Sequence, residues 1–192
     1  MDRPSGRSTD MQAVTSATIA GRAPLAVPSE AESFADLYER CFTRVYGYVA
    51  SLLRDSSAAE DVTAQAFERA YRKRSSYRPA RGSAEAWLFG IARNAALDEL
   101  RRRKRQAPLE AEHEDHTLTG PDDGAELALT RELVRAALAT LDARERDLVA
   151  LKFAGGLSNA ELAHVLGTSE SNAGTRLHRT VTKLRMACDE LA

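Results

Sequence analysis

Seven polar or basic side chains near the C-terminus could contact nucleic acid. They lie in a stretch from Ser171 to Arg185 that contains no acidic residue. An acidic side chain would be repelled by phosphate, so an acid-free helical face suits a helix that reads base edges. A helical hairpin with a solvated basic face is the alternative interpretation. The residues that we expect to contact DNA here are Ser171, Asn172, Thr175, Arg176, His178, Arg179 and Lys183.

A second basic cluster, Arg101 to Arg105, consists of five consecutive Arg and Lys residues at the end of a predicted helix. Basic residues at such an end interact favourably with the helix dipole. Because five exceed what the dipole requires, we expect this cluster to follow a nucleic-acid backbone.

Catalytic and metal chemistry find little support in the sequence. We find no glycine-rich phosphate loop, no nucleophile elbow and no metal triad, so we expect neither an enzyme nor a bound cofactor. His113 and His116 flank two acidic residues but have no further ligands nearby, and we predict no metal site. Cys41 falls in an apolar helical stripe, which favours a reduced core thiol and a cytoplasmic protein. No apolar run reaches the ~20 residues that cross a bilayer, so we expect no membrane insertion.

The C-terminal stretch has the layout of a helix-turn-helix. Ser158 and Glu161 form a capping box, and Gly167 suits the left-handed turn that ends the short helix after them. Thr168 or Ser169 then caps the last helix, which we expect to run to about Met186. A second capping box, Asp142 with Glu145, starts the helix before the motif, and a further helical period begins at Leu127.

The N-terminal half predicts three more helices. Apolar residues at three- and four-residue steps begin after Ser33, and a capping box of Ser57 with Glu60 opens a second helix from Ala58 to about Arg74. After a polar loop, Ser83 caps a third helix that runs to about Arg105. Its predicted inward side chains are Trp87, Leu88, Ile91, Ala95 and Leu100. With no alternating strand pattern, the chain is predicted to be all-α.

The net charge of −1 conceals a segregation of charge along the chain. Residues 33–105 carry an excess of six positive charges, and residues 106–126 carry seven acidic residues and no Lys or Arg. We therefore predict a disordered extension over 1–32, a basic helical domain over 33–105, a flexible acidic linker over 106–126 and a second helical domain over 127–192. The low aromatic content favours two small cores over one large core.

Three segments, in order, resemble one family. Residues 87–105 closely resemble the promoter-melting helix of the extracytoplasmic-function (ECF) group of the sigma-70 family of bacterial RNA polymerase sigma factors. Residues 59–71 resemble the helix with which that family grips the polymerase clamp, and residues 141–185 resemble its C-terminal promoter-reading domain. The resemblance implies sigma region 2 over 33–105 and sigma region 4 over 127–192. It further implies a factor that directs transcription initiation by binding core RNA polymerase and promoter DNA, with an anti-sigma factor as a further partner.

The resemblance also implies roles for single residues. Asn94 and Asp98 match positions that face the minus-ten element, and the loop with Tyr77 and Arg78 matches one that captures a flipped base. Trp87 is either part of this surface or a core residue. The expected minus-ten and melting residues are Tyr77, Arg78, Trp87, Asn94, Asp98, Arg101, Arg102 and Arg103, and the expected polymerase-binding residues are Asp61, Gln65 and Arg69.

Two positions depart from the family pattern. Where the clamp-binding helix usually carries Gln then Glu, this chain has Ala64 and Gln65, which places more of that contact on Asp61. In the recognition helix, Gly174 stands where a basic residue is usual, and glycine inside a helix costs roughly 1 kcal/mol relative to alanine.

Two other classes of protein compete with this interpretation. The segment 141–184 also resembles the DNA-binding domain of response-regulator and quorum-sensing regulators, which would require an α/β receiver or ligand domain before it. A helical adaptor is the remaining alternative, but it leaves the Arg101 to Arg105 cluster unexplained.

Overall fold

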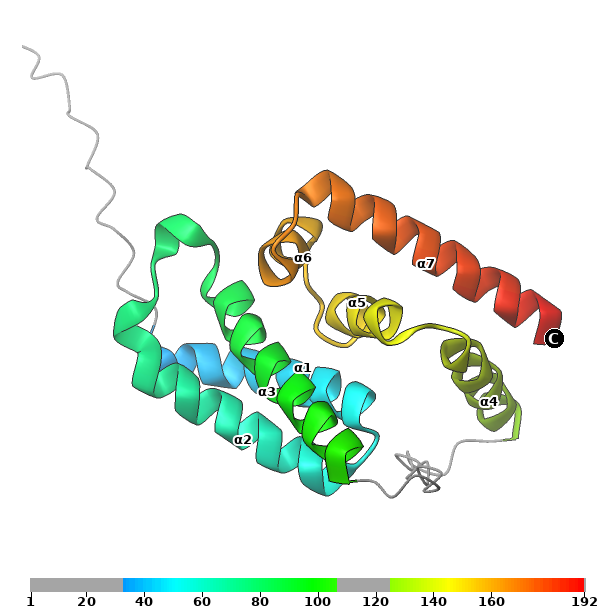
Figure 1. Cartoon of the computed structure of the whole chain (residues 1–192), viewed down its shortest axis with the longest axis horizontal. Helices are drawn as coiled ribbons and strands as arrows, with labels where there is room; N and C mark the ends of the chain where they lie inside the picture. The colour runs from blue at the N-terminus through cyan, green and yellow to red at the C-terminus, as the bar shows by residue number, and fades with distance from the viewer. Residues whose placement is uncertain (1–32, 107–124, 192) are drawn as a thin grey trace, which may run out of the picture. The chain divides into compact units, whose positions relative to one another are not determined.

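The computed structural model describes residues 33–106 and 125–191, in which every regular element is helical and no strand occurs (Figure 1). The predicted all-α fold is confirmed. The predicted extension over 1–32 and most of the predicted linker, including His113 and His116, lie outside the described residues. No helix in the described ranges combines the length and the apolar character that a bilayer crossing requires.

Three long helices make up the first half of the fold. They are α1 (Phe34–Leu53), α2 (Ser56–Lys73) and α3 (Ala84–Gln106), with two short 3-10 turns, η1 (Arg74–Ser76) and η2 (Pro79–Arg81), before α3. Ser33 caps α1 by accepting a hydrogen bond from the Ala35 N–H at 3.2 Å. Ser83 caps α3, as predicted, by accepting one from the Ala86 N–H at 3.1 Å.

The start predicted for α2 is wrong by two residues. Arg54 adopts a left-handed conformation with φ of 51°, and this sharp turn leaves Asp55 extended in front of the helix. The Asp55 carboxylate therefore accepts the Ala58 N–H at 3.0 Å and serves as the N-cap. Ser57 already lies inside the first turn, so the predicted Ser57–Glu60 box does not form.

Four helices make up the second half: α4 (Ala125–Ala139), α5 (Ala143–Phe153), α6 (Asn159–Leu166) and α7 (Glu170–Leu191). Both predicted capping boxes, Asp142 with Glu145 and Ser158 with Glu161, are present. The last helix continues five residues past the predicted end at Met186, and Ala187 is buried in that extra length.

Most of the buried apolar residues form one connected cluster, which differs from the two separate cores expected from the composition. The cluster joins side chains of α1, α2 and α3 to Leu148 and Leu151 of α5 and to Leu162 of α6. On α3, Phe89 is fully buried, although it was not predicted to be, while Trp87 and Ile91 are only half-buried. The reason is that Phe89 packs against the turn after α5, which no local pattern reveals.

Candidate nucleic-acid and polymerase interfaces

The helix-turn-helix is built from α6, a tight turn and α7. Gly167 ends α6 in a left-handed conformation with φ of 64°, a region that glycine enters without strain. Ser169 then caps α7 by accepting the Asn172 N–H at 3.2 Å. Leu162 of α6 and Ala173 of α7 are fully buried, so a small residue lets the two helices pack closely.

The exposed face of α7 carries most of the residues expected to contact DNA. Arg176 is half-buried, and the other six residues of this set are exposed: Ser171, Asn172, Thr175, His178, Arg179 and Lys183. Two of these residues already have partners. The Asn172 amide donates to Thr168 Oγ1 at 2.7 Å, and Lys183 Nζ lies 2.7 Å from Glu145 Oε2.

The unusual glycine of α7 has room for a side chain. A Cβ atom at Gly174 would lie 3.7 Å from the Asn159 amide nitrogen, an ordinary van der Waals distance. Close packing therefore does not require glycine at this position. The low helix propensity of Gly174 is not offset by a close approach that only glycine would permit.

The basic end of α3 is partly engaged within the fold. Arg101 pairs with Asp98 at 2.8 Å, and Arg102 makes two 2.7 Å bonds to Glu99. Arg103 is half-buried and bonds to both Glu99 and Asp55, each at 2.9 Å. The bonds from Arg102, aided by those from Arg103, lower the pKa of Glu99 to about 2.

Arg103 thus links the end of α3 to Asp55, the N-cap of α2, and so helps to hold the two helices together. Lys104 and Arg105 are exposed, as are Asn94 and Asp98. The exposed side chains at this end of α3 form the surface that we expect to meet the minus-ten element.

The loop before α3 is organised around Tyr77. Its hydroxyl donates to the Gly82 carbonyl oxygen at 3.1 Å, and its ring lies 5.5 Å from that of Trp87. The Arg78 guanidinium donates to the carbonyl oxygens of Ser75 and Tyr77. Trp87 packs against the core cluster, which fits the core alternative, while the Tyr77 ring lies beside it.

The predicted polymerase-binding face of α2 borders a groove shared with α3. Asp61, Gln65 and Arg69 follow one another at four-residue steps and are all exposed. They line a groove of about 420 Å³ together with Asp98 and Arg102 of α3. The structure therefore brings residues assigned to polymerase and residues assigned to DNA onto one surface.

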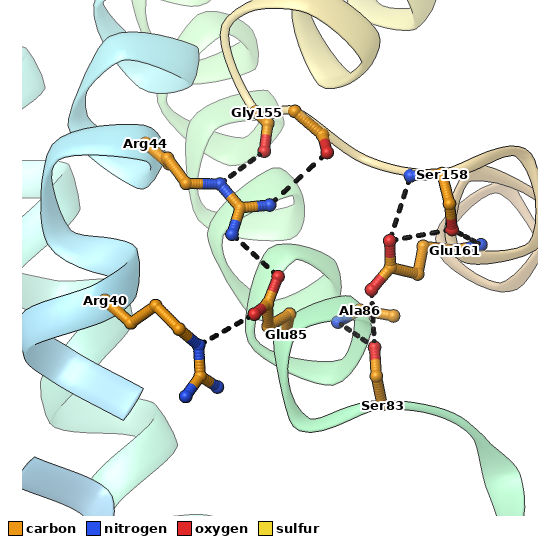
Figure 2. A network of polar contacts seen from close by, with 9 residues as sticks. Arg40, Arg44, Ser83, Glu85, Ala86, Gly155, Ser158 and Glu161 are labelled. Carbon is orange, nitrogen blue, oxygen red and sulfur yellow. Dashed lines mark hydrogen bonds and ion pairs between the residues drawn. The ribbon is translucent and has the colours of Figure 1, made fainter. Parts of the chain in front are cut away.

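A polar network connects α1 and the start of α3 to the turn after α5 and to α6 (Figure 2). Arg44 of α1 donates to the Gly155 carbonyl oxygen at 2.9 Å and pairs with Glu85 of α3 at 2.7 Å. The Ser83 hydroxyl donates to Glu161 of α6 at 2.8 Å. Burial opposes a lower pKa for Glu161, but its hydrogen bonds from Ser158 and Ser83 outweigh it and lower the pKa.

A buried carboxylate, Asp147 of α5, also joins α5 to α1 and α3. Asp147 is only 3% exposed. Its carboxylate accepts the Tyr48 hydroxyl at 2.8 Å and pairs with Arg93 Nε at 2.7 Å. Burial, and then the neighbouring Asp147 charge, raise the pKa of Tyr48 well above its ordinary value. The phenol is therefore protonated at neutral pH and able to donate.

Sequence reasoning did not single out Tyr48, Arg93 or Asp147. Asp147 follows the Asp142–Glu145 capping box and looks like another exposed acid of a helix. The signal that could have found it was its helical spacing from apolar residues, because Ala143 lies four residues before it and Leu151 lies four residues after it.

Comparison with known proteins decides the family. Sigma-70 region 2 matches residues 37–106, and Sigma-70 region 4 matches residues 131–184. The chain is 31% identical over 193 residues to the ECF RNA polymerase sigma factor SigK of Mycobacterium ulcerans (strain Agy99), covering 98% of this chain and 99% of that relative. The chain belongs to the ECF RNA polymerase sigma factors. It is also 32% identical over 168 residues to SigL of Mycobacterium tuberculosis, covering 86% of this chain and 94% of the relative.

Solved structures of sigma factors share this fold. RpoE of Bartonella quintana, solved with the anti-sigma factor NepR, matches with a TM-score of 0.64 at 22% identity, over 81% of this chain and 96% of that one. CnrH, solved with the cytosolic domain of CnrY, matches with a TM-score of 0.60 at 24% identity, over 83% and 89%. The ECF sigma factor assignment therefore holds for sequence and fold, and the regulator alternative is not favoured.

Proposed function

We propose that this ECF sigma factor binds core RNA polymerase and directs it to promoters with paired minus-ten and minus-thirty-five elements, without catalysing a reaction itself. The observation that carries this proposal is the presence of both sigma regions in one chain, together with a relative similar over nearly its whole length. We place the protein in the cytoplasm, where polymerase and DNA are found.

The division of labour follows the surfaces described above. The exposed face of α7, from Ser171 to Lys183, reads the minus-thirty-five element from the major groove. The exposed end of α3 and the Tyr77 loop act at the minus-ten element, with Asn94 and Asp98 facing bases. The α2 face of Asp61, Gln65 and Arg69 contacts the polymerase.

A selection experiment tests this function on DNA of random sequence, so the promoter need not be specified. Random duplexes are selected with bacterial core RNA polymerase carrying the full chain, and in parallel with the chain alone. We expect the holoenzyme to enrich two motifs at a fixed spacing, and the selected duplexes to support transcription from a defined start.

Variants assign the two motifs. Replacing Arg176 and Arg179 by alanine should weaken enrichment of the upstream motif, and replacing Asn94 and Asp98 should weaken the downstream one. Enrichment of a single motif by the chain alone, with no effect of polymerase, would favour the helix-turn-helix regulator instead.

A further inference from the structure

Gly174 interrupts the α7 side chains that we expect to meet the minus-thirty-five element. Ser171, Thr175 and His178 lie on the same side of the helix, at steps of four and three residues, and all three are exposed. Side chains arranged in this way on a recognition helix read base edges in the major groove. Because glycine has no side chain, α7 itself offers nothing to the bases opposite position 174, and packing does not explain the glycine.

The side chain nearest to this gap comes from the other helix of the motif. Asn159 Nδ2 of α6 lies 3.7 Å from the position that a Cβ atom of residue 174 would take, and it is the only atom from another described helix within 4 Å of that position. Asn159 is exposed, and its side-chain amide makes no hydrogen bond to residues 33–106 or 125–191. Its donors and its acceptor are therefore available to DNA.

The start of α6 holds Asn159 in place. Asn159 is the first residue of this helix and directly follows the N-cap Ser158, whose hydroxyl accepts the Glu161 N–H at 3.2 Å and whose N–H donates to the Glu161 carboxylate at 2.9 Å (Figure 2). In a helix-turn-helix, the first helix crosses the DNA backbone while the second lies in the major groove. A side chain located between the two helices therefore approaches the DNA together with them.

We propose that Asn159 is a specificity-determining residue, whose amide reads a base edge of the minus-thirty-five element through the gap at Gly174. This inference rests on the proposed function. An Asn amide donates and accepts at once, and it pairs with N6 and N7 of adenine in the major groove. Asn172 of α7 is less suited to this contact, because its amide already donates to Thr168 Oγ1 at 2.7 Å. The gap in α7 thus lets α6 supply a base reader.

A purely structural role for Asn159 predicts different behaviour. Its side chain is exposed and is not the N-cap, and alanine is the better helix former. Asn159→Ala should therefore keep the helix content and the melting temperature of the free protein. Circular dichroism measures both, so a loss of DNA binding by this variant is not a loss of folding.

The test uses the full-length protein in polymerase holoenzyme and the upstream motif that wild type selects from random DNA. The variants are Asn159→Ala, Gly174→Arg and the two combined. Ala160→Asn added to Asn159→Ala is the matched control, because it moves the same amide one residue along α6, about 100° around the helix. Fluorescence anisotropy measures the affinity of each holoenzyme for the selected duplex and for every single-base change in the upstream motif.

We expect Asn159→Ala to weaken binding to the selected duplex about tenfold and to remove the preference at one A·T base pair of the motif. Gly174→Arg should shift the preference at that same pair toward G·C, because the longer side chain fills the gap and contacts guanine. In the Gly174→Arg background, Asn159→Ala should cost less than about twofold, because the displaced amide has no contact left to lose. The control should bind as weakly as Asn159→Ala alone.

Three results would overturn this inference alone, provided that the upstream motif still responds to Arg179→Ala. They are wild-type binding by Asn159→Ala, a uniform loss across all base changes, which indicates a phosphate contact, and independent effects of Asn159→Ala and Gly174→Arg. If wild-type holoenzyme selected no upstream motif, the proposed function would fail and this inference with it.

Discussion

Single side chains assigned to DNA divide into two groups by what they contact inside the fold. Carboxylates pair with Lys183, Arg102 and Arg103, whereas His178 and Arg179 lie exposed on the recognition face. A paired cation must give up its partner before it contacts phosphate, which reduces the net gain. Exposed members of each surface are therefore the better candidates for direct contact.

Glu99 gives this division a measurable consequence. Its pKa of about 2 in the folded protein lies below the ordinary 4.5, so its stabilising effect is present above about pH 4.5 and is lost as pH falls toward 2. We expect Glu99→Gln to lower the free energy of unfolding by ~1–2 kcal/mol at neutral pH, and by less as the pH approaches 3. Urea unfolding of both proteins across this range measures it.

Glu68→Gln is the matched control, because Glu68 pairs with Arg72 on an exposed stretch of α2. An exposed pair of this kind contributes roughly 0.3–0.5 kcal/mol. A Glu99→Gln effect that stayed constant with pH would contradict an ionic origin.

Arg179 is the second test at this scale. If it reads a guanine edge, Arg179→Ala should cost ~1–3 kcal/mol of promoter binding and relax the preference at one base of the minus-thirty-five element. Holoenzyme binding to a set of single-base promoter variants measures both effects. Arg185→Ala, an exposed change farther along α7, is the control. A uniform loss across all promoters would indicate a phosphate contact instead.

Among the elements, α2 carries a surface that its own spacing defines. Asp61, Gln65 and Arg69 share one face, and Ala64 stands where the family usually has a polar residue. The remaining acidic group, Asp61, therefore bears more of the expected contact with the polymerase clamp.

We expect Asp61→Arg to abolish recovery of core polymerase in a pull-down, because it reverses the charge on that face. Glu60→Arg makes the same charge change on an adjacent, exposed position that points about 100° away around the helix. Circular dichroism checks that both variants keep their helices. Equal recovery of polymerase by Asp61→Arg and wild type would remove α2 from the interface.

At the scale of the whole molecule, the segregation of charge suggests a restraint on DNA binding by the free chain. The acidic linker can compete with phosphate for the basic surface of residues 33–105, and a plain spacer is the alternative. Such competition between exposed charges weakens with salt, whereas the buried Asp147 centre is screened much less.

Neutralising the linker separates these cases. We expect the free protein with six linker acids replaced by amides to bind promoter duplex more tightly, most clearly at low salt, and the holoenzyme to change less. Gel-shift titrations at two salt concentrations measure this. Unchanged affinity of the free protein at low salt would mean that the linker is a spacer. The six positions are Glu110, Glu112, Glu114, Asp115, Asp122 and Asp123.

The sequence by itself determined the helices, two of the capping boxes and the family, because periodicity and capping act over three or four residues. It placed the cap of α2 wrongly, since the left-handed turn at Arg54 has no local signature in a non-glycine residue. Only the tertiary structure decided that Asp147 is buried, because its partners Tyr48 and Arg93 lie 99 and 54 residues away in the chain. Contacts of that range form only when distant parts of the chain pack together.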